Sequence, residues 1–169
     1  MDKFDYSYSK TRQATYAVVL VAIGVALAPF TSFPAGIARI NPTQHFINVI
    51  AAVLLGPWWA IGIAGIIGVI RNALGVGTFL AFPGGMIGAL CAGYLYRLIK
   101  KIPFSAAGEV IGTGFIAPVV SALWVAPALM GRNIGFLALF PSFLASSLTG
   151  AVIAVLALRF LDHAGVISL

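Results

Sequence analysis

The strongest constraint on the fold is a long apolar run at residues 14–30, which is continuous and rich in Ala, Leu and Val. A transmembrane helix needs roughly 20 predominantly apolar residues, whereas a strand of a transmembrane barrel needs about ten residues that alternate between apolar and polar. This run does not alternate. It therefore predicts an α-helix that crosses a membrane.

The composition extends this prediction to the rest of the chain. Hydrophobic residues make up 61% and charged residues 8%, and the mean hydropathy is +1.06. A soluble domain has roughly a quarter of its residues charged, and a chain this apolar would expose large apolar patches to water. At roughly 20 residues per span plus short loops, the 169 residues allow about six spans and no separate soluble domain. We predict an all-α, six-transmembrane-helix bundle.

Proline, glycine and charged residues mark the expected helix ends. The predicted helices cover residues 15–30, 42–55, 57–74, 84–101, 106–130 and 136–161, with a first loop at 31–41. Residues 1–13 are expected to form an N-terminal tail, 14–162 the transmembrane domain and 163–169 a short C-terminal tail. The polar start followed by an apolar run superficially resembles a signal peptide. Because no convincing small-residue cleavage site follows, we interpret the run as a retained first helix.

The basic residues predict an orientation. With six spans, one side of the membrane carries Lys3, Lys10, Arg12, Arg97, Lys100, Lys101 and Arg159, and the other carries Arg39, Arg71 and Arg132. The positive-inside rule then places both termini in the cytoplasm. The net charge of +6 serves mainly this orientation and attraction to anionic lipid. The basic residues form no patch interleaved with aromatic residues, so nucleic-acid binding is not expected.

Polar side chains gather on the side opposite the termini, where they are costly in lipid and indicate function. In the predicted second helix, Gln44, His45 and Asn48 have spacings of three and four and share a face. The remaining polar and aromatic candidates, from other helices and loops, are expected near the same end of the predicted bundle. Such a convergence of donors, acceptors and aromatic rings is typical of a pocket for a small, partly polar molecule. The candidate binding residues are Gln44, His45, Asn48, Arg71, Asn72, Trp124 and Asn133.

Each of these residues also has a structural explanation when it is taken alone. His45 fits a hydrogen-bonded packing residue, Arg71 an interfacial side chain that reaches toward water, and Trp124 an aromatic belt. Trp58 and Trp59 lie at the predicted cytoplasmic boundary, where an aromatic belt explains both. The clustering of the polar residues favours a site.

The sequence offers little for catalysis or ion coupling. Glu109 and Asp162 are the acids beyond the N-terminal tail, and both are expected at cytoplasmic helix ends. Glu109 in a first helical turn is favoured by the helix dipole. The glycines at 75–77 and 112–114 lack the Lys-Ser/Thr sequel of a P-loop, and Cys91 fits core packing. We therefore predict no catalytic residue, no metal, no cofactor bound by this chain, and no acid beside the polar cluster.

Small residues on the first helix form a separate pattern. Ala22 and Ala26 are four apart, as are Gly24 and Ala28. Such spacing lets another helix approach closely. It fits either docking of a partner helix or packing inside the bundle.

Several short motifs occur in order along the chain and carry a resemblance to a known family. They are PTQHFINV (42–49), LLGP (54–57), RN (71–72), GVGT (75–78), LAFPG (80–84), GA (88–89), YR (96–97) and GEVIGTG (108–114). With these motifs, the chain resembles the ThiW group of substrate-binding S components of energy-coupling factor (ECF) vitamin transporters.

The resemblance implies a concrete role. Such S components are small six-helix proteins of the prokaryotic plasma membrane that bind a vitamin or its precursor near the outer face. They dock on a transmembrane T component that carries two cytoplasmic ATPases, which use ATP, and they release the cargo inside by toppling in the membrane. For this chain the implied cargo is hydroxyethylthiazole, the thiazole precursor of thiamine, and residues 14–162 form the substrate-binding domain.

The resemblance also suggests roles for particular residues. It implies that Ala22 and Ala26 mediate T-component docking. The first loop, with Phe30, Phe33 and Pro34, is a candidate lid. Two alternatives stay open: an S component for another small heteroaromatic such as the pyrimidine precursor of thiamine, or a membrane-embedded enzyme or assembly subunit that uses His45.

Overall fold

The computed structural model describes residues 9–167. Lys3 and most of the predicted N-terminal tail therefore lie outside the described residues. The elements, in order, are α1 (Lys10–Thr31), β1 (Phe33–Ala35), β2 (Ala38–Ile40), α2 (Pro42–Leu55), α3 (Pro57–Ala73), α4 (Ala81–Ile99), α5 (Ile102–Ile111), η1 (Gly112–Ile116), α6 (Ala117–Val120), η2 (Ser121–Val125), α7 (Ala126–Met130) and α8 (Phe136–His163).

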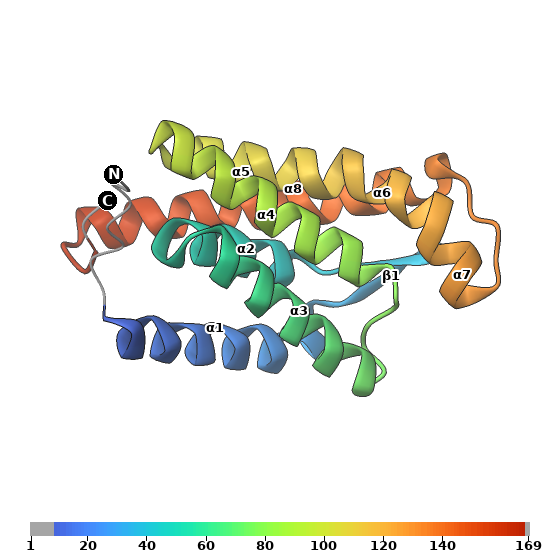
Figure 1. The fold of residues 1–169 in the computed structure, drawn as a ribbon, viewed down its shortest axis with the longest axis horizontal. Coiled ribbons are helices and arrows are strands. Elements are labelled where there is room, and N and C mark those ends of the chain that lie inside the picture. Colours follow the sequence, from blue (N-terminus) through green and yellow to red (C-terminus); the bar gives the residue numbers. More distant parts are fainter. Residues whose placement is uncertain (1–8, 168–169) are drawn as a thin grey trace.

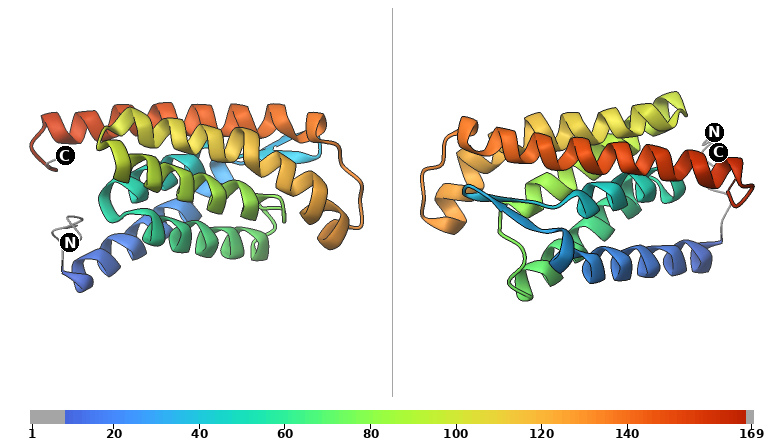
Figure 2. Two further views of the ribbon diagram at one scale, coloured as in Figure 1. Left: turned by 45° about the horizontal axis from the view of Figure 1, so that its top comes forward. Right: turned by 180° about the vertical axis from the view of Figure 1, so that it is seen from behind.

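The helices run side by side along the long axis of the molecule, with α1 at one edge and α5 with α8 at the other (Figures 1 and 2). α2 lies in the middle, in contact with α1, α3, α4, α5 and α8. Its side chains Ile47, Val49, Ala51 and Ala52 are completely buried. Its polar residues Gln44, His45 and Asn48 are buried as well, so α2 is enclosed by the bundle and forms the centre of the core.

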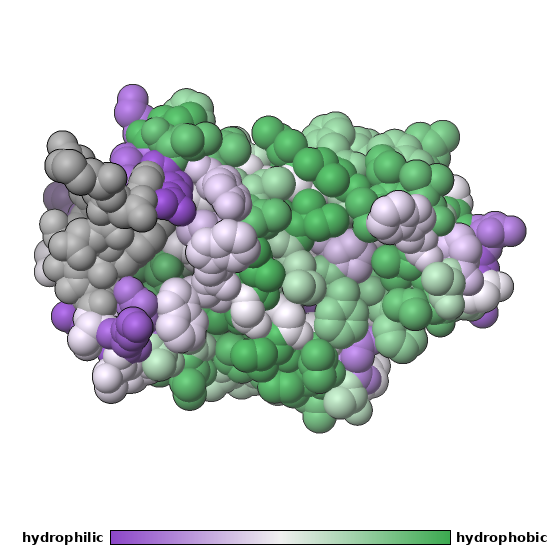
Figure 3. Space-filling view, in the orientation of Figure 1, coloured by the Kyte–Doolittle hydropathy of each residue, from purple (hydrophilic) through white to green (hydrophobic). Residues whose placement is uncertain are grey.

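Three stretches within residues 9–167 are long and apolar enough to cross a membrane, namely Lys10–Thr31, Ile102–Met130 and Phe136–His163. Their outward side chains are apolar, and Val18 and Leu137 are 68% and 80% exposed. The surface in Figure 3 is hydrophobic along the middle of the molecule, and its polar residues gather at the two ends. This distribution suits a protein surrounded by lipid. The six-helix count and the predicted domain limits stay predictions.

The stretch Ile102–Met130 contains two wider turns, η1 and η2, which are π-helical. In each, the N–H of the residue before a proline donates to the carbonyl five residues back. Pro118 and Pro127 have no N–H, so the ordinary hydrogen-bond spacing is interrupted just where each wide turn forms.

This stretch begins at Ile102, whereas the sequence predicted a start at residue 106. The prolines explain the difference, because Pro103 occupies the first turn of α5, where a missing N–H costs nothing. The earlier start moves Glu109 out of the first turn and into the helix interior. The helix-dipole explanation of Glu109 is therefore wrong.

The predicted loop at 31–41 contains a β-hairpin. β1 pairs antiparallel with β2 in the register Phe33↔Ile40, Pro34↔Arg39 and Ala35↔Ala38. Gly36 makes the turn with φ 63°, a conformation that glycine adopts without strain. The hairpin packs on α8, where the Ser142 hydroxyl donates to the Ala35 carbonyl at 3.0 Å.

The start of α1 and the end of α8 lie at one end of the molecule, and the hairpin lies at the other (Figures 1 and 2). Among the basic residues that the structure describes, Lys10, Arg12, Arg97, Lys100, Lys101 and Arg159 belong to the first end, and Arg39, Arg71 and Arg132 to the hairpin end. The charges thus separate as the sequence predicted. Which end faces the cytoplasm stays a prediction.

Candidate functional site

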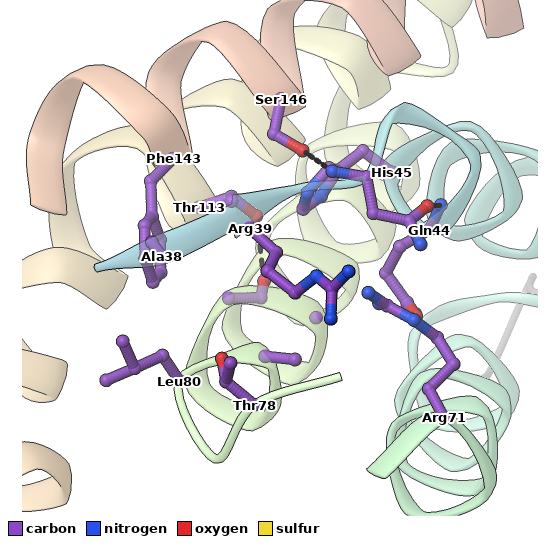
Figure 4. A pocket seen from close by; sticks show the side chains of 14 residues that line it. Ala38, Arg39, Gln44, His45, Arg71, Thr78, Leu80, Thr113, Phe143 and Ser146 are labelled. Atoms are coloured by element: carbon purple, nitrogen blue, oxygen red, sulfur yellow. Dashed lines mark hydrogen bonds between the residues drawn. The ribbon is translucent and has the colours of Figure 1, made fainter. Parts of the chain in front are cut away.

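A cavity opens at the hairpin end, enclosed by β2, the first turns of α2, the end of α3, the start of α4, η1 and α8 (Figure 4). Its volume is about 30 Å³, which is room for one or two water molecules. Its wall is partly apolar, with Ala38, Leu80 and Phe143. The polar side chains that line it are Arg39, Asn41, Gln44, His45, Arg71, Thr78, Thr113 and Ser146.

Asn41 fixes the start of α2 and with it the direction of the next side chains. Its side-chain oxygen accepts from the Gln44 backbone N–H at 3.1 Å, which caps the helix. Its side-chain amide donates to the Ser32 hydroxyl, and its backbone N–H donates to the Ser146 hydroxyl, both at 2.8 Å. α1, α2 and α8 are thereby joined at one residue, and Gln44 and His45 in the first turn face the cavity.

Arg71 reaches from the end of α3 toward the same cavity and is only 2% exposed. Its guanidinium donates to Gln44 Oε1 at 3.4 Å and to the Ser32 hydroxyl at 3.2 Å. Gln44 in turn donates to Asn48 Oδ1 at 3.3 Å. A chain of polar side chains therefore links the cavity to the buried middle of α2.

Beneath the cavity, Glu109 is completely buried and lies within hydrogen-bond distance of three side chains from two helical stretches. Its Oε1 lies 2.7 Å from His45 Nδ1, 3.2 Å from Asn48 Nδ2 and 2.8 Å from Thr113 Oγ1. The prediction that no acid lies beside the polar cluster is therefore wrong. A single acid within an apolar helix forms no periodic pattern in the sequence. The sequence therefore does not show which residues of other helices surround it.

Gly88 of α4 makes room for this acid. A Cβ at residue 88 would lie 2.5 Å from Glu109 Oε1 and would also collide with Thr113 Oγ1. The π turn η1 supplies Thr113, whose hydroxyl also lies 2.8 Å from the Gly84 carbonyl. Wide turns of this kind recur at functional sites.

Glu109 also orients His45, which lines the cavity. When Nδ1–H donates to the carboxylate, Nε2 of the neutral ring is the nitrogen left to accept a hydrogen bond. A carboxylate partner that fixes a histidine tautomer in this way is common at functional histidines.

The structure brings Gln44, His45, Asn48 and Arg71 together, as the sequence predicted, but not the other candidates. The Asn72 amide donates to the carbonyls of Gly68 and Thr78, at 2.8 and 3.2 Å, and so stabilises the connection from α3 to α4. Trp124 is 73% exposed, on the outside of η2, and Asn133 is exposed in the loop before α8. For Trp124 the aromatic-belt explanation fits this position better than a binding role.

Several residues of the cavity were absent from the predicted set. Thr113 and Ser146 are small polar residues inside apolar helices, where such side chains often bond only to their own backbone. The motif GEVIGTG contains both Glu109 and Thr113, and it was a signal for this part of the site. Arg39 was placed at the correct end, but the hairpin that brings it to the cavity was not foreseen.

The small residues of α1 divide into two faces. Gly24 and Ala28 are buried, and a Cβ at residue 24 would lie 2.5 Å from Ile67 Cδ1. Ala22 and Ala26 are exposed on the outer side of the helix. The first pair packs inside the bundle, and the second is available to a partner.

Comparison with protein families gives a match over residues 14–164 to the model described as thiamine-precursor transporter protein (ThiW). The chain belongs to the ThiW family. This match covers nearly the whole chain and confirms the resemblance carried by the sequence motifs. ThiW membership, with the apolar helices, makes it a multi-pass protein of the plasma membrane.

A solved structure supports the fold independently. The S component of a bacterial ECF transporter matches this ThiW protein with a TM-score of 0.75 and 17% identity, over 92% of this chain and 98% of that one. At this identity the likeness concerns the fold. The comparison with curated proteins gives no match.

Proposed function

We propose that this protein is the substrate-binding S component of an ECF-type importer and captures hydroxyethylthiazole, the thiazole precursor of thiamine. The observation that carries the proposal is the cavity at the hairpin end, lined by His45, Gln44 and Arg71 inside an otherwise apolar bundle. Membership of the thiamine-precursor transporter family and the fold of an S component support it.

The cavity offers the groups that such a ligand requires. The ring nitrogen of a thiazole accepts a hydrogen bond, which the guanidinium of Arg71 or the amide of Gln44 can donate. The hydroxyl of the hydroxyethyl arm can donate to His45 Nε2. Phe143, which lines the same cavity, offers an aromatic face on which the ring can stack.

Binding requires the cavity to widen. A thiazole with a hydroxyethyl arm is several times larger than one water molecule, whereas the cavity has a volume of about 30 Å³. The wall formed by β2 and by Thr78 and Leu80 before α4 is the part not built from long helices. We expect the hairpin and this connection to move outward, so that the hairpin acts as the lid.

Orientation and partners follow from the same role. Both termini lie in the cytoplasm and the cavity opens at the outer face of a six-helix bundle. The exposed side of α1 that carries Ala22 and Ala26 docks on the T component, and two ATPases supply energy from ATP. This chain itself binds no cofactor and catalyses no reaction.

Calorimetry with the purified protein in detergent tests the proposal. Hydroxyethylthiazole is expected to bind, and His45→Ala or Asn48→Ala should weaken binding about five- to 150-fold, because one lost buried hydrogen bond costs about 1–3 kcal/mol. His163→Ala is the control, since His163 is exposed at the far end of α8. Unchanged affinity in both helix-α2 variants would remove α2 from the site.

The alternatives predict other outcomes of the same measurement. If the pyrimidine precursor of thiamine binds and the thiazole does not, the protein is an S component with another cargo. A membrane enzyme that uses His45 would convert the ligand, which mass spectrometry of the recovered ligand detects. We expect the ligand to be recovered unchanged.

A further inference from the structure

Two arginines face each other across the cavity. The side chains of Arg39, from β2, and Arg71, from α3, point toward one another in Figure 4. Neither forms a salt bridge within residues 9–167. The acids there are Glu109, bound to His45, and Asp162 near the end of α8 at the opposite end of the molecule. Glu109 is the one acid near the cavity, and its Oε1 is taken by His45, Asn48 and Thr113, so neither arginine is paired with an acid of the described chain.

The partners that the two guanidinium groups do have are neutral. Arg71 donates to Gln44 and Ser32, and Arg39 donates to the Gly75 carbonyl at 3.3 Å. The Nε atoms of both arginines are buried and have no hydrogen-bond partner. Arg71 is only 2% exposed, so its charge is shielded from bulk water.

A structural role explains only part of this arrangement. Arg71 connects α3 to Ser32 and Gln44, which accounts for its Nη atoms but not for the unpartnered Nε atoms or for a second arginine beside it. A buried charge without an opposite charge is strongly unfavourable. Each arginine raises this cost for the other, because like charges repel.

We propose that the cargo carries a negatively charged group that is held between Arg39 and Arg71, and that this group is a phosphate monoester on the hydroxyl arm of the precursor. The inference rests on the proposed function, because it specifies the form of the precursor that the cavity takes. The forked donors of arginine match the oxygens of a phosphate and can bind two of them at once. Such a group supplies acceptors for the two Nε atoms and compensates both positive charges.

Calorimetry with four probes tests this inference. The probes are hydroxyethylthiazole, its phosphate monoester, the pyrimidine alcohol precursor of thiamine and its phosphate monoester. The probes form a thiazole pair and a pyrimidine pair, each an alcohol and its ester. In the pair that the cavity binds, the ester is expected to bind at least about tenfold more tightly than the alcohol. Arg39→Gln should remove most of this preference.

Arg71 also donates hydrogen bonds to Ser32 and Gln44, so its complete removal could disturb the fold. We therefore choose Arg71→Lys at this position and check by thermal unfolding that the variant is folded. The lysine keeps the charge and loses the forked geometry, so the preference should decrease but not vanish. Arg132→Gln is the matched control, because Arg132 is an exposed arginine at the same end that does not line the cavity. It should keep the full preference.

The outcomes separate this inference from the proposed function. If hydroxyethylthiazole binds as tightly as its ester and the pyrimidine pair shows no preference either, the anionic cargo is ruled out and the proposed function stands. If the preference for the ester survives in full in both cavity variants, Arg39 and Arg71 do not hold the phosphate and the inference is overturned, while the proposed function stands. If the preference occurs only in the pyrimidine pair, the inference stands and the thiazole assignment fails. If none of the four probes binds, both are overturned.

Discussion

Glu109 holds the polar side chains beneath the cavity together, because His45, Asn48 and Thr113 all contact its Oε1. The acid is completely buried, and its second oxygen has no partner within residues 9–167. Replacing the carboxylate by a neutral amide weakens the hydrogen bond that orients the ring of His45.

We therefore expect Glu109→Gln to weaken ligand binding by about tenfold, because a hydrogen bond to a charged group contributes about 1.5–3 kcal/mol. Glutamine retains the shape of the side chain, so the fold should persist. Calorimetry measures the affinity, and Asp162→Asn at the exposed end of α8 is the control. Wild-type affinity of Glu109→Gln would show that the acid does not orient the site.

Gly88 is the second residue on which the buried network depends. A methyl group at this position would collide with Thr113 and Glu109. Gly88→Ala is expected to lower the free energy of unfolding by about 1–3 kcal/mol and to weaken binding, since overpacking displaces the network.

Gly62→Ala on α3 is the matched control for Gly88→Ala. A Cβ at residue 62 meets nothing within 4 Å, and alanine is the better helix former by about 1 kcal/mol. Thermal unfolding in detergent should show a decrease for the first variant and no decrease for the second. Equal effects would mean that the contact at Gly88 is unimportant.

At the level of elements, α1 lies at the edge of the bundle and buries only its inner side, at Ala17, Leu20, Gly24 and Ala28. Its outer side exposes Val19, Ile23 and Leu27 together with Ala22 and Ala26. Small residues in a row let a second helix lie close against the first.

Ala22→Leu is expected to leave ligand affinity at the wild-type value and to abolish uptake, because a larger side chain on the outer side keeps the T component away. Growth of a thiazole auxotroph measures uptake, and calorimetry measures binding. Gly24→Leu on the inner side should instead disrupt folding, since residue 24 touches Ile67. Wild-type growth of an Ala22→Leu, Ala26→Leu double variant would contradict the docking role.

At the level of the whole molecule, an ionisable pair lies inside the bundle close to the cavity. Buried His and Glu residues in a membrane often mark proton pathways, so Glu109 and His45 favour proton-coupled transport as the competing mechanism. The proposed role as an S component predicts instead a protein that binds its cargo but does not transport it alone.

We expect the purified chain in liposomes to accumulate no labelled hydroxyethylthiazole, or its ester, under a proton or sodium gradient. A T component with its two ATPases and ATP should restore accumulation. Accumulation by the chain alone would overturn the ECF mechanism, and its loss in Glu109→Gln would then identify Glu109 as the coupling residue.

Residue patterns alone predicted the membrane environment, the order of the helices and the family. Apolar runs such as 14–30 meet only the requirements of a helix in lipid, and Pro42, Gly56 and Pro57 end or begin helices by local backbone geometry. Residue patterns also predicted that Gln44, His45 and Asn48 share a face, because that depends on spacing within one helix.

Which distant residues complete the site depends on contacts between helices, and no pattern within one helix predicts them. Glu109 meets His45 across 64 positions, and Arg39 reaches the cavity because residues 33–40 form a hairpin rather than an open loop. Trp124 and Asn133 were assigned to the right end but lie outside the cavity. The direction of a side chain depends on how each helix is rotated in the bundle, and two π turns set that rotation near Thr113 and Trp124. A lipid-exposed helix is apolar on both its inner and outer sides, so hydropathy does not reveal which side faces the site.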